Sequence, residues 1–428
     1  MKKQIYFPVL LLLMSSFLLQ SCLQDACEAT RTFVRFDPIY KQATDLRTDV
    51  SYEDARALKN PGKIYYYGQY MFINERKEGI HIIDNSNPES PQNIAFINIQ
   101  GNIDMAVRGN TLYADSYMDL LVLDISTLTQ PRILDRQEDV FIRNFPFDAN
   151  RGYIVDYEET DITEEINCSD PRFGQANFWR GGVLFANAEV DFAASGVRGG
   201  GGAVNSNAPT GVGGSFARFA IYQDFLYVID NSKMDVFDIK AEERLNLLNS
   251  VEVGWNIETI FPYQDKLFIG SSTGMFIFNN QDPTNPQFAS LFTHARACDP
   301  VVVEGTTAYV TLRDGTFCEG FSNQLDIVDI KDVFNPRLIA SHDMDNPHGL
   351  SVRDDIVYLC DGNSGLKVFD VENPKSIDQL DHEKFKTYDA IALPNSDLLM
   401  VIGDDGFYQF DASNPKKLKQ LSVIPVEK

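Results

Sequence analysis

Charged and titratable side chains recur in this sequence at the start of short apolar clusters, most of which are spaced about 40 residues apart. Aligned on those clusters, the six residues are Asp104, Arg218, Glu258, Asp299, His348 and Asp389. Carboxylates, a guanidinium and an imidazole that gather at one level of a repeating fold can bind a polar ligand through charge and hydrogen bonds. The alternative is that these groups pair with one another or face solvent. We therefore treat the six residues as a predicted ligand-binding site.

Motifs for catalysis and metal binding are missing from the sequence. None of the five histidines lies in an HExxH motif, and no GxSxG motif places a serine nucleophile. The acidic run Asp156–Glu165 lacks the spacing of an EF-hand, so we interpret it as the solvated face of a strand. We predict no catalytic residue, no metal site and no cofactor. Because the chain has 61 acidic residues, a pair of carboxylates of the glycosidase type stays open as an alternative.

The composition is that of a globular and strongly acidic chain. The 428 residues are 44% hydrophobic and 23% charged, and the net charge is −24. An acidic surface repels phosphate backbones, which argues against a nucleic-acid partner. Only one apolar stretch, at the N-terminus, approaches the length of a membrane span, which excludes a polytopic membrane protein.

Residues 1–21 have the features of an export signal. Two lysines precede the apolar stretch Ile5–Leu19, which is too short for a comfortable transmembrane span. The stretch ends in Leu-Gln-Ser-Cys, which resembles a bacterial lipobox and implies acylation of Cys22; a plain secretory signal is the alternative. Acyl chains on Cys22 would hold the chain on a membrane.

Residues 22–61 are predicted to form a tether and an N-terminal segment. Asp25 and Glu28 follow the lipidated cysteine closely, and this placement resembles the surface-export signals of Bacteroidetes lipoproteins. The resemblance implies an outer-membrane lipoprotein at the cell surface, with the periplasmic side as the alternative.

An apolar run that ends in Asp or Asn recurs along the rest of the chain, and most copies are followed by a turn that contains proline. The runs end at Asp84, Asp124, Asp238, Asn279, Asp329, Asp370 and Asp411. The successive intervals are 40, 114, 41, 50, 41 and 41 residues, which is too regular for chance. The anchor side chain can accept a hydrogen bond from the backbone beyond it, and proline then ends the strand.

Each repeat contains four short clusters of Val, Ile, Tyr and Phe separated by Gly, Asn and Asp, which predicts four short strands. Four strands in about 40 residues, repeated, are typical of a β-propeller blade. We predict an all-β fold, a β-propeller of seven four-stranded blades over residues 62–428. An eight-bladed propeller is the alternative, with a degraded blade around Tyr153–Val155.

The runs LVLDI, LDIVDI and LKVFDV, each followed by the proline turn, resemble the LVIVD repeat of exported bacterial and archaeal proteins. The resemblance extends over about residues 62–424 and implies a propeller. It implies no catalytic residue, because the repeat carries none that is shared across its family.

The interval of 114 residues exceeds the repeat of 41 by 73 and predicts a long inserted loop at about residues 138–215. The glycine-rich end of this insert, Gly199–Gly214, lacks the GK[ST] of a P-loop, and we interpret it as a flexible loop. A second extension, Arg313–Asn323, lies between the second and third strands of the fifth blade. Both extensions are expected on the face where the innermost strands begin, so the six polar residues would ring the channel mouth on that face.

Five cysteines remain besides Cys22, so at least one is a free thiol in an oxidising compartment. Cys298 and Cys318 are about 20 residues apart and are expected on the same face of the fifth blade, which predicts a disulfide between them. Cys360 ends a predicted strand, and we predict that it is a buried free thiol.

These observations predict a non-catalytic cell-surface lipoprotein that is attached to the membrane by its N-terminal lipid. It would bind an unidentified ligand or partner, a carbohydrate or a protein, through the face that carries the insert. One alternative is a carbohydrate-active enzyme, a polysaccharide lyase or hydrolase, that uses carboxylates at the channel mouth. The other is a structural subunit of an outer-membrane complex.

Overall fold

The structure is a computed structural model. It describes residues 28–167, 170, 177–180, 183–187, 199–200, 211–241, 243–293, 300–313 and 322–427. The signal segment and Cys22 lie outside the described residues, as do Asp299, Cys298 and Cys318.

Seven antiparallel sheets contain the predicted succession of four strands. In chain order, the first sheet contains β3 (Pro61–Tyr67), β4 (Tyr70–Glu75), β5 (Gly79–Asp84) and β6 (Gln92–Asn98), and the second contains β7 (Met105–Arg108), β8 (Thr111–Ser116), β9 (Asp119–Asp124) and β10 (Arg132–Gln137). The third sheet contains β18 (Phe219–Tyr222), β19 (Phe225–Ile229), β20 (Lys233–Asp238) and β21 (Asn246–Glu252). The fourth contains β22 (Ile257–Tyr263), β23 (Lys266–Ser271), β24 (Gly274–Asn279) and β25 (Gln287–Thr293).

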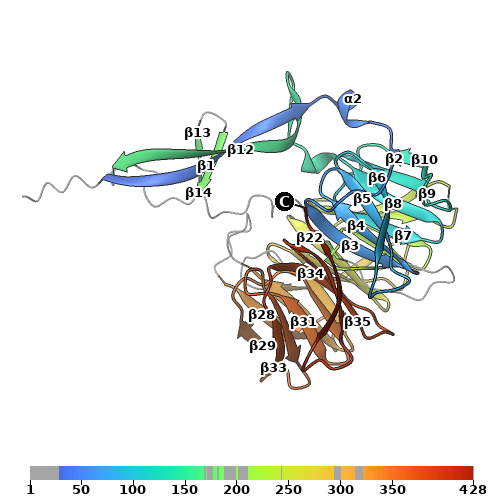
Figure 1. Cartoon of the computed structure of the whole chain (residues 1–428), viewed down its shortest axis with the longest axis vertical. Helices are drawn as coiled ribbons and strands as arrows, with labels where there is room; N and C mark the ends of the chain where they lie inside the picture. The colour runs from blue at the N-terminus through green and yellow to red at the C-terminus, as the bar shows by residue number, and fades with distance from the viewer. Residues whose placement is uncertain are drawn as a thin grey trace, which may run out of the picture. The chain divides into compact units, whose positions relative to one another are not determined.

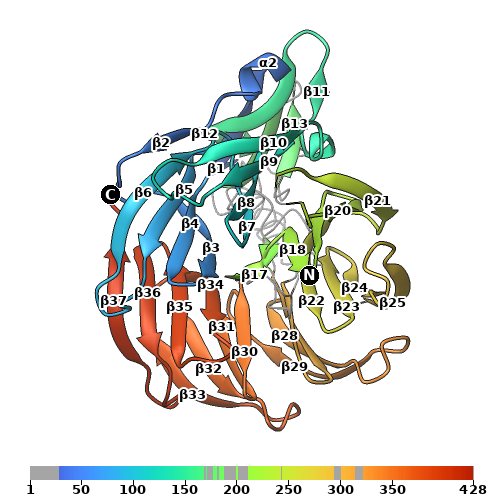
Figure 2. The ribbon, with the colours of Figure 1, turned by 90° about the vertical axis from the view of Figure 1, so that its right-hand side faces the viewer.

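The other three sheets follow the same order. The fifth sheet contains β26 (Val301–Glu304), β27 (Thr307–Leu312), β28 (Gln324–Asp329) and β29 (Arg337–Asp343). The sixth contains β30 (Leu350–Arg353), β31 (Ile356–Cys360), β32 (Leu366–Asp370) and β33 (Asp378–Glu383). The seventh contains β34 (Thr387–Ala392), β35 (Leu398–Gly403), β36 (Gly406–Asp411) and β37 (Lys419–Pro425). Figure 2 shows the sheets around a common centre, with the first of the four strands towards the centre and the fourth towards the rim. The first sheet has six strands, because β16 (Val212–Gly213) pairs with β3 on its inner edge and β2 (Ser51–Glu53) pairs with β6 on its outer edge. The predicted all-β propeller fold is confirmed.

The two middle strands of each sheet are mostly buried, because their apolar side chains pack against the neighbouring sheets. β8 and β9 illustrate this burial, since almost every residue of both strands is inaccessible to solvent. The residues of the outermost strands are exposed or half-buried, as in β29 and β37. This gradient explains why the two middle clusters of each repeat are the most apolar in the sequence.

The anchor residues at the ends of the third strands have the predicted role. In all seven sheets the Oδ1 atom of the anchor accepts a hydrogen bond from the backbone N–H two residues later. Asn279 forms this bond as the six aspartates do. Directly beyond the turn, each third and fourth strand pair contains a register shift, which bends the outer strand.

The last sheet is fastened to the first at a seam. The side chain of Gln409 in β36 exchanges hydrogen bonds of 2.8 Å with the side chain of Asn85, and Ser422 Oγ donates to the carbonyl of Pro88 at 2.6 Å. A parallel bridge joins Leu58 to Val426 close to the C-terminus. The chain therefore closes its ring with residues from both ends of the propeller.

A further sheet combines the N-terminal segment with the insert. Its strand order is β11 (Phe147–Asp148), β12 (Gly152–Asn167), β1 (Glu28–Lys41), β14 (Val183–Asn187) and β13 (Asn177–Arg180). Figure 1 shows the long strands β1 and β12 side by side. The segment Tyr153–Val155, which was the alternative position for an eighth blade, lies in β12 and pairs in this sheet. Tyr153 pairs with Phe147 of β11, and β12 lies between β11 and β1 in this five-stranded sheet, so the segment is not part of a four-stranded sheet of the repeat type.

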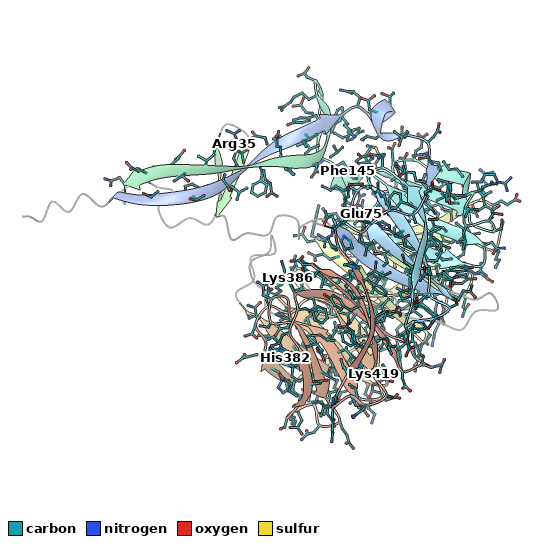
Figure 3. The ribbon with its side chains drawn as sticks, in the orientation of Figure 1. Arg35, Glu75, Phe145, His382, Lys386 and Lys419 are labelled. Carbon is teal, nitrogen blue, oxygen red and sulfur yellow. The ribbon has the colours of Figure 1, made fainter. Side chains whose placement is uncertain are left out.

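Part of that sheet forms a compact unit of its own, which includes residues 28–39 and the described residues between 156 and 187. In this unit Phe33 and Phe36 are buried, and Phe36 contacts the edge of Tyr157. Arg35 Nε, which is labelled in Figure 3, donates to Asp37 at 2.6 Å. The acidic run Asp156–Glu165 lies on β12 with most of its side chains exposed.

Helix is almost absent from the part of the chain that the structure describes. The described residues contain one short α-helix, α2 (Ala43–Leu46), and one 3-10 turn, η1 (Ile142–Asn144). In this part of the chain no helix has the length and apolar character needed to cross a membrane.

Candidate functional site at the centre of the propeller

The structure places five of the six predicted site residues at or beside the start of an innermost strand. Asp104 and Arg218 directly precede β7 and β18, and His348 lies two residues before β30. Glu258 and Asp389 lie within the first residues of β22 and β34. The predicted level of these residues in the fold is therefore correct, and the sixth residue, Asp299, lies outside the described residues.

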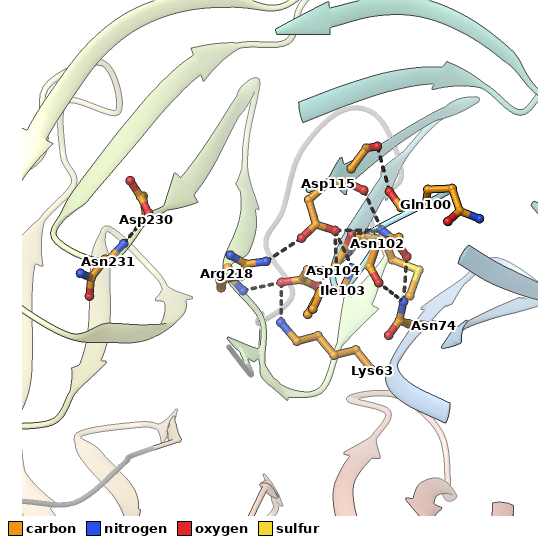
Figure 4. A network of polar contacts seen from close by, with 12 residues as sticks. Lys63, Asn74, Gln100, Asn102, Ile103, Asp104, Asp115, Arg218, Asp230 and Asn231 are labelled. Atoms are coloured by element: carbon orange, nitrogen blue, oxygen red, sulfur yellow. Dashed lines mark hydrogen bonds and ion pairs between the residues drawn. The ribbon is translucent and has the colours of Figure 1, made fainter. Parts of the chain in front are cut away.

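Asp104 and Arg218 are brought into direct contact. The backbone N–H of Arg218 donates to Oδ2 of Asp104 at 2.5 Å, and Lys63 Nζ donates to the same oxygen at 2.8 Å. The guanidinium of Arg218 donates through Nη2 to Oδ2 of Asp115 at 2.6 Å. Figure 4 shows this network, which joins β3, the second sheet and the start of β18. The alternative that these groups pair with one another therefore holds for Asp104 and Arg218.

Asp115 is held by its own sheet on the other side. Its Oδ1 atom accepts hydrogen bonds from the backbone N–H groups of Ile103 at 2.7 Å and Asp104 at 2.9 Å. The side-chain amide of Asn102 donates to the same oxygen at 2.9 Å. These donors fix the loop before β7, so the geometry of the ion pair with Arg218 is set by the backbone.

Burial governs the electrostatics of this network. Desolvation lowers the pKa of Lys63 to about 8, while the neighbouring Asp104 carboxylate opposes that shift. Desolvation also raises the pKa of Asp115, and Arg218 opposes that rise. Two cations and two carboxylates thus balance one another at nearly inaccessible positions, an arrangement in which removing one partner leaves a buried charge.

The centre of the ring is occupied by residues 211–217, which we call the central segment. It is the end of the insert and contains β16 (Val212–Gly213) and β17 (Ser215–Phe216). β16 pairs antiparallel with β3 along the inner edge of the first sheet. The interpretation of the whole glycine-rich stretch as a flexible loop is therefore wrong for Gly211–Gly214.

Backbone hydrogen bonds attach the central segment to several innermost strands. Gly211 N donates to the carbonyl of Val107 at 3.2 Å, and Ile260 N donates to the carbonyl of Ala217 at 3.0 Å. Leu350 N donates to Ser215 Oγ at 2.8 Å. The segment thereby bonds to strands that lie far apart in the sequence.

Two glycines allow this close approach. A Cβ atom added at Gly211 would lie 2.1 Å from a ring carbon of Tyr65, and one added at Gly214 would lie 1.8 Å from Oδ2 of Asp389. Neither separation is tolerable for a real side chain. The glycines are required here because the segment touches its neighbours through its backbone.

Asp389 accepts hydrogen bonds from the central segment. Its Oδ1 atom accepts hydrogen bonds from Ser215 N at 3.1 Å, Ser215 Oγ at 3.0 Å and Ala390 N at 3.0 Å. Burial raises the pKa of Asp389 to about 7, although these donors and the charge of Lys63 oppose the shift. This carboxyl group consequently changes its protonation near neutral pH.

His348 has a different set of neighbours. Arg313 Nη1 lies 2.6 Å from Nδ1 of His348, and the edge of Tyr388 contacts the imidazole ring. The backbone N–H of His348 donates to the carbonyl of Cys360 at 2.7 Å. Both His348 and Arg313 are buried. Cys360 is a buried free thiol, as predicted, and burial raises its pKa well above the ordinary value.

Glu258 is half-buried in β22 and follows the most exposed large apolar side chain of the described residues. That side chain is Trp255, which is 76% exposed and lies in the loop between β21 and β22. The next residue, Asn256, has a φ of 52°, a left-handed conformation that Asn tolerates. Since the innermost strands begin at this loop, Trp255 stands on the predicted binding face.

Sequence reasoning missed Lys63, Asp115, Ser215 and Arg313. A signal existed for two of them, because Asp115 and Arg313 stand at the end of the second apolar cluster of their repeats. Asp230 has an equivalent position after β19, where its Oδ1 atom accepts a hydrogen bond from Asn231 N at 2.7 Å (Figure 4). The second strands thus supply polar partners to the starts of the first strands.

Among the described residues, no group of three or more His, Cys, Asp and Glu side chains is arranged to hold a metal ion. The polar groups at the centre instead bond to the protein itself.

The comparisons with known proteins support the repeat and the fold. LVIVD repeats match residues 62–96 and 103–136, which contain the first two sheets, so the predicted repeat is confirmed there. None of the curated proteins matches the chain.

Several solved structures are similar to the chain. The computationally designed Ika8 protein has 10% sequence identity and a TM-score of 0.50, over 86% of this chain and 90% of that protein. BamB from Moraxella catarrhalis has 7% identity and a TM-score of 0.48, over 80% and 81% of the two chains. The periplasmic gluconolactonase PpgL of Pseudomonas aeruginosa has 12% identity and a TM-score of 0.49, over 88% and 98%. At 10% identity the likeness to Ika8 concerns the fold alone.

Proposed function

We propose that this propeller with LVIVD repeats is a non-catalytic cell-surface lipoprotein that binds a ligand or protein partner through the face on which its innermost strands begin. The observation that carries the proposal is the exposed Trp255 on this face, in a loop held between two rigid sheets. A large rigid aromatic group contributes much contact area at little cost in conformational entropy, and tryptophan is enriched at the centres of binding sites.

The buried groups at the centre support a scaffold role. Asp104, Asp115 and Asp389 are engaged by Arg218, Lys63 and Ser215, so these carboxylates hold sheets and the central segment together. A catalytic carboxylate has to reach a substrate, whereas these three are at least 97% inaccessible. The function of this face therefore depends on its loops.

A pair of matched variants tests the proposal. Trp255→Ala removes the exposed side chain of the binding face, while Phe334→Ala removes a side chain that is 67% exposed in the turn between β28 and β29, on the opposite face. Both variants and the wild type, labelled in the same way, are probed on arrays of surface polysaccharides and by cross-linking to intact cells. We expect Trp255→Ala to weaken binding at least tenfold and Phe334→Ala to leave it unchanged. Equal binding by all three proteins would refute the proposed face.

The alternative of a carbohydrate-active enzyme depends on Glu258, which is the half-buried carboxylate among the described members of the predicted site. If the wild type cleaves a polysaccharide, and Glu258→Gln still binds that polysaccharide but no longer cleaves it, the alternative is correct and the non-catalytic proposal is wrong. Binding without turnover in the wild type would support the non-catalytic function.

A further inference from the structure

We propose that the central segment, residues 211–217, is a built-in plug that closes the centre of the propeller and docks more tightly when Asp389 takes up a proton. The proposal concerns a conformational device of the fold and does not depend on which ligand the outer face binds. It is carried by the bonds of Ser215, the packing of Gly214 and the surroundings of the Asp389 carboxyl group.

The plug is specific in its contacts. Ser215 Oγ accepts a hydrogen bond from Leu350 N at 2.8 Å and donates one to Asp389 Oδ1 at 3.0 Å, so this hydroxyl links two neighbouring sheets. On the opposite side, β16 continues the first sheet through its pairing with β3. A segment that merely crossed the centre would not be bonded on both sides.

The plug also closes over a carboxyl group that has no cation of its own. Asp389 is 3% exposed, and within the described part of the chain no Lys or Arg forms an ion pair with it. All three donors address Oδ1, while Oδ2 lies against the backbone of Gly214. An ionised carboxylate in such surroundings is costly, and protonation on Oδ2 would remove the charge while Oδ1 keeps its donors.

Other titratable groups face this position from the neighbouring strands. Lys63 on β3 favours the ionised form of Asp389 by its charge, but its ammonium group is bonded to Asp104. Cys360 on β31 interacts with the Asp389 charge, and burial raises the pKa of the thiol, so it adds no charge near neutral pH. His348 precedes β30, and its ring is oriented towards Arg313 and Tyr388. Asp389 is therefore the carboxyl group at the plug whose pKa is raised into the neutral range.

The direction of the pH effect follows from proton binding. With the plug docked, the pKa of Asp389 is raised from 3.8 to about 7, so the docked state binds a proton that the undocked state releases. Docking is tightest below about pH 4 and weakens as the pH rises to about 7, by up to about tenfold per pH unit, and it levels off above that range.

Hydrogen exchange of the full chain, followed by mass spectrometry at pH 5 and pH 7.5 and corrected for intrinsic exchange rates, tests this device. The reporters are peptides that contain the amides of Gly211, Ile260 and Leu350, which bond across the plug. We expect their opening to increase by at least tenfold from pH 5 to pH 7.5 in the wild type. In Asp389→Asn, which imitates the protonated acid, the same amides should stay protected at both values.

Two more variants complete the experiment. Asp329→Asn is the matched control, since Asn279 takes the same anchor position in another sheet, and it should show the pH dependence of the wild type. Gly214→Ala introduces a Cβ that cannot fit against Asp389, so the plug amides should exchange rapidly at both pH values while the outer sheets stay protected. A wild type without pH dependence, an Asp389→Asn variant that keeps it, or a protected plug in Gly214→Ala would each overturn the proposal.

Discussion

Asp104 and Arg218 are separated by 114 residues, yet the backbone N–H of Arg218 donates directly to the carboxylate of Asp104. The insert lies between them in the sequence, so this bond joins the sheet before the insert to the sheet after it. The side chain of Arg218 then continues to Asp115 in the same earlier sheet. The two sheets that the insert separates in the sequence are thus held together by the hydrogen bond from the backbone N–H of Arg218 and by the ion pair between Arg218 and Asp115.

Replacing Arg218 by Met should lower the free energy of unfolding by about 3–5 kcal/mol, because Asp115 is left as a buried carboxylate without its cation. Urea titration monitored by tryptophan fluorescence and circular dichroism measures the change. Arg132→Met removes the exposed pair with Asp124 and should cost less than about 1 kcal/mol. Similar losses in both variants would contradict the structural role of Arg218.

Lys63 should make stability depend on pH in the alkaline range. Its pKa is lowered from 10.5 to about 8 in the folded chain, so between these values the unfolded chain binds a proton that the folded chain does not. The free energy of unfolding of the wild type should therefore rise relative to Lys63→Met between about pH 8 and pH 10.5, by up to about 1.4 kcal/mol per pH unit. Denaturant titrations at pH 7.5, 8.5 and 9.5 check this, and a constant difference would show that the ammonium group is not buried as described.

The anchor turns should tolerate Asn but not Ala. Asp370 Oδ1 accepts a hydrogen bond of 3.0 Å from Glu372 N, so Asp370→Ala should cost about 1 kcal/mol, while Asp370→Asn should be nearly neutral. The comparison uses chemical denaturation of the two variants side by side. An equal loss in both would mean that the negative charge, and not the acceptor, holds the turn.

Membrane attachment should depend on Cys22, which lies outside the described residues. Cys22→Ala should move the protein from the membrane fraction to the soluble fraction, because the acyl chains are the proposed anchor. Cys27→Ala, five residues later, is the matched control and should stay with the membranes. Retention of Cys22→Ala on membranes washed at high salt would rule out the lipid anchor.

Cys298 and Cys318, also outside the described residues, are predicted to form a disulfide. Peptide mapping without reduction should recover the two cysteines in one linked pair, and Cys360 should be alkylated only after unfolding because it is buried. Replacing both Cys298 and Cys318 by Ser should lower the free energy of unfolding by about 3 kcal/mol in the chain-entropy model for a loop of about 20 residues. Recovery of Cys298 as a free thiol, or linked to Cys168, would disprove the pairing.

The parts of the fold that sequence reasoning predicted correctly are those that repeat locally. Strand clusters and anchor turns are determined by neighbours a few residues away, as the hydrogen bond from the backbone N–H of Ser86 to the carboxylate of Asp84 shows, and the pattern occurs seven times. The position of Asp104 and Arg218 at the start of an innermost strand follows from the same periodicity. Their pairing does not, because the partners Lys63 and Asp115 come from other positions of the repeat and from other sheets.

The central segment could not be predicted for a different reason. Gly211 and Gly214 are needed because they lack a side chain, and such a requirement leaves no apolar pattern in the sequence. Ser215 bonds to Asp389 at a separation of 174 residues, which no local rule detects. A glycine-rich stretch therefore looks the same in sequence whether it is loose or closely packed.

The seam at Leu58 and Val426 also sets an order of events during biosynthesis. Because Val426 follows the last sheet and its bridge partner Leu58 precedes the first sheet, the ring cannot close until all seven sheets have been synthesised. Until then, Gln409 and Asn85 cannot form their hydrogen bonds, and the apolar faces of the first and last sheets that pack together in the closed ring are exposed to solvent. A chain that stops before β37 would thus remain an open ring, and its unpaired strand edges could associate with other chains.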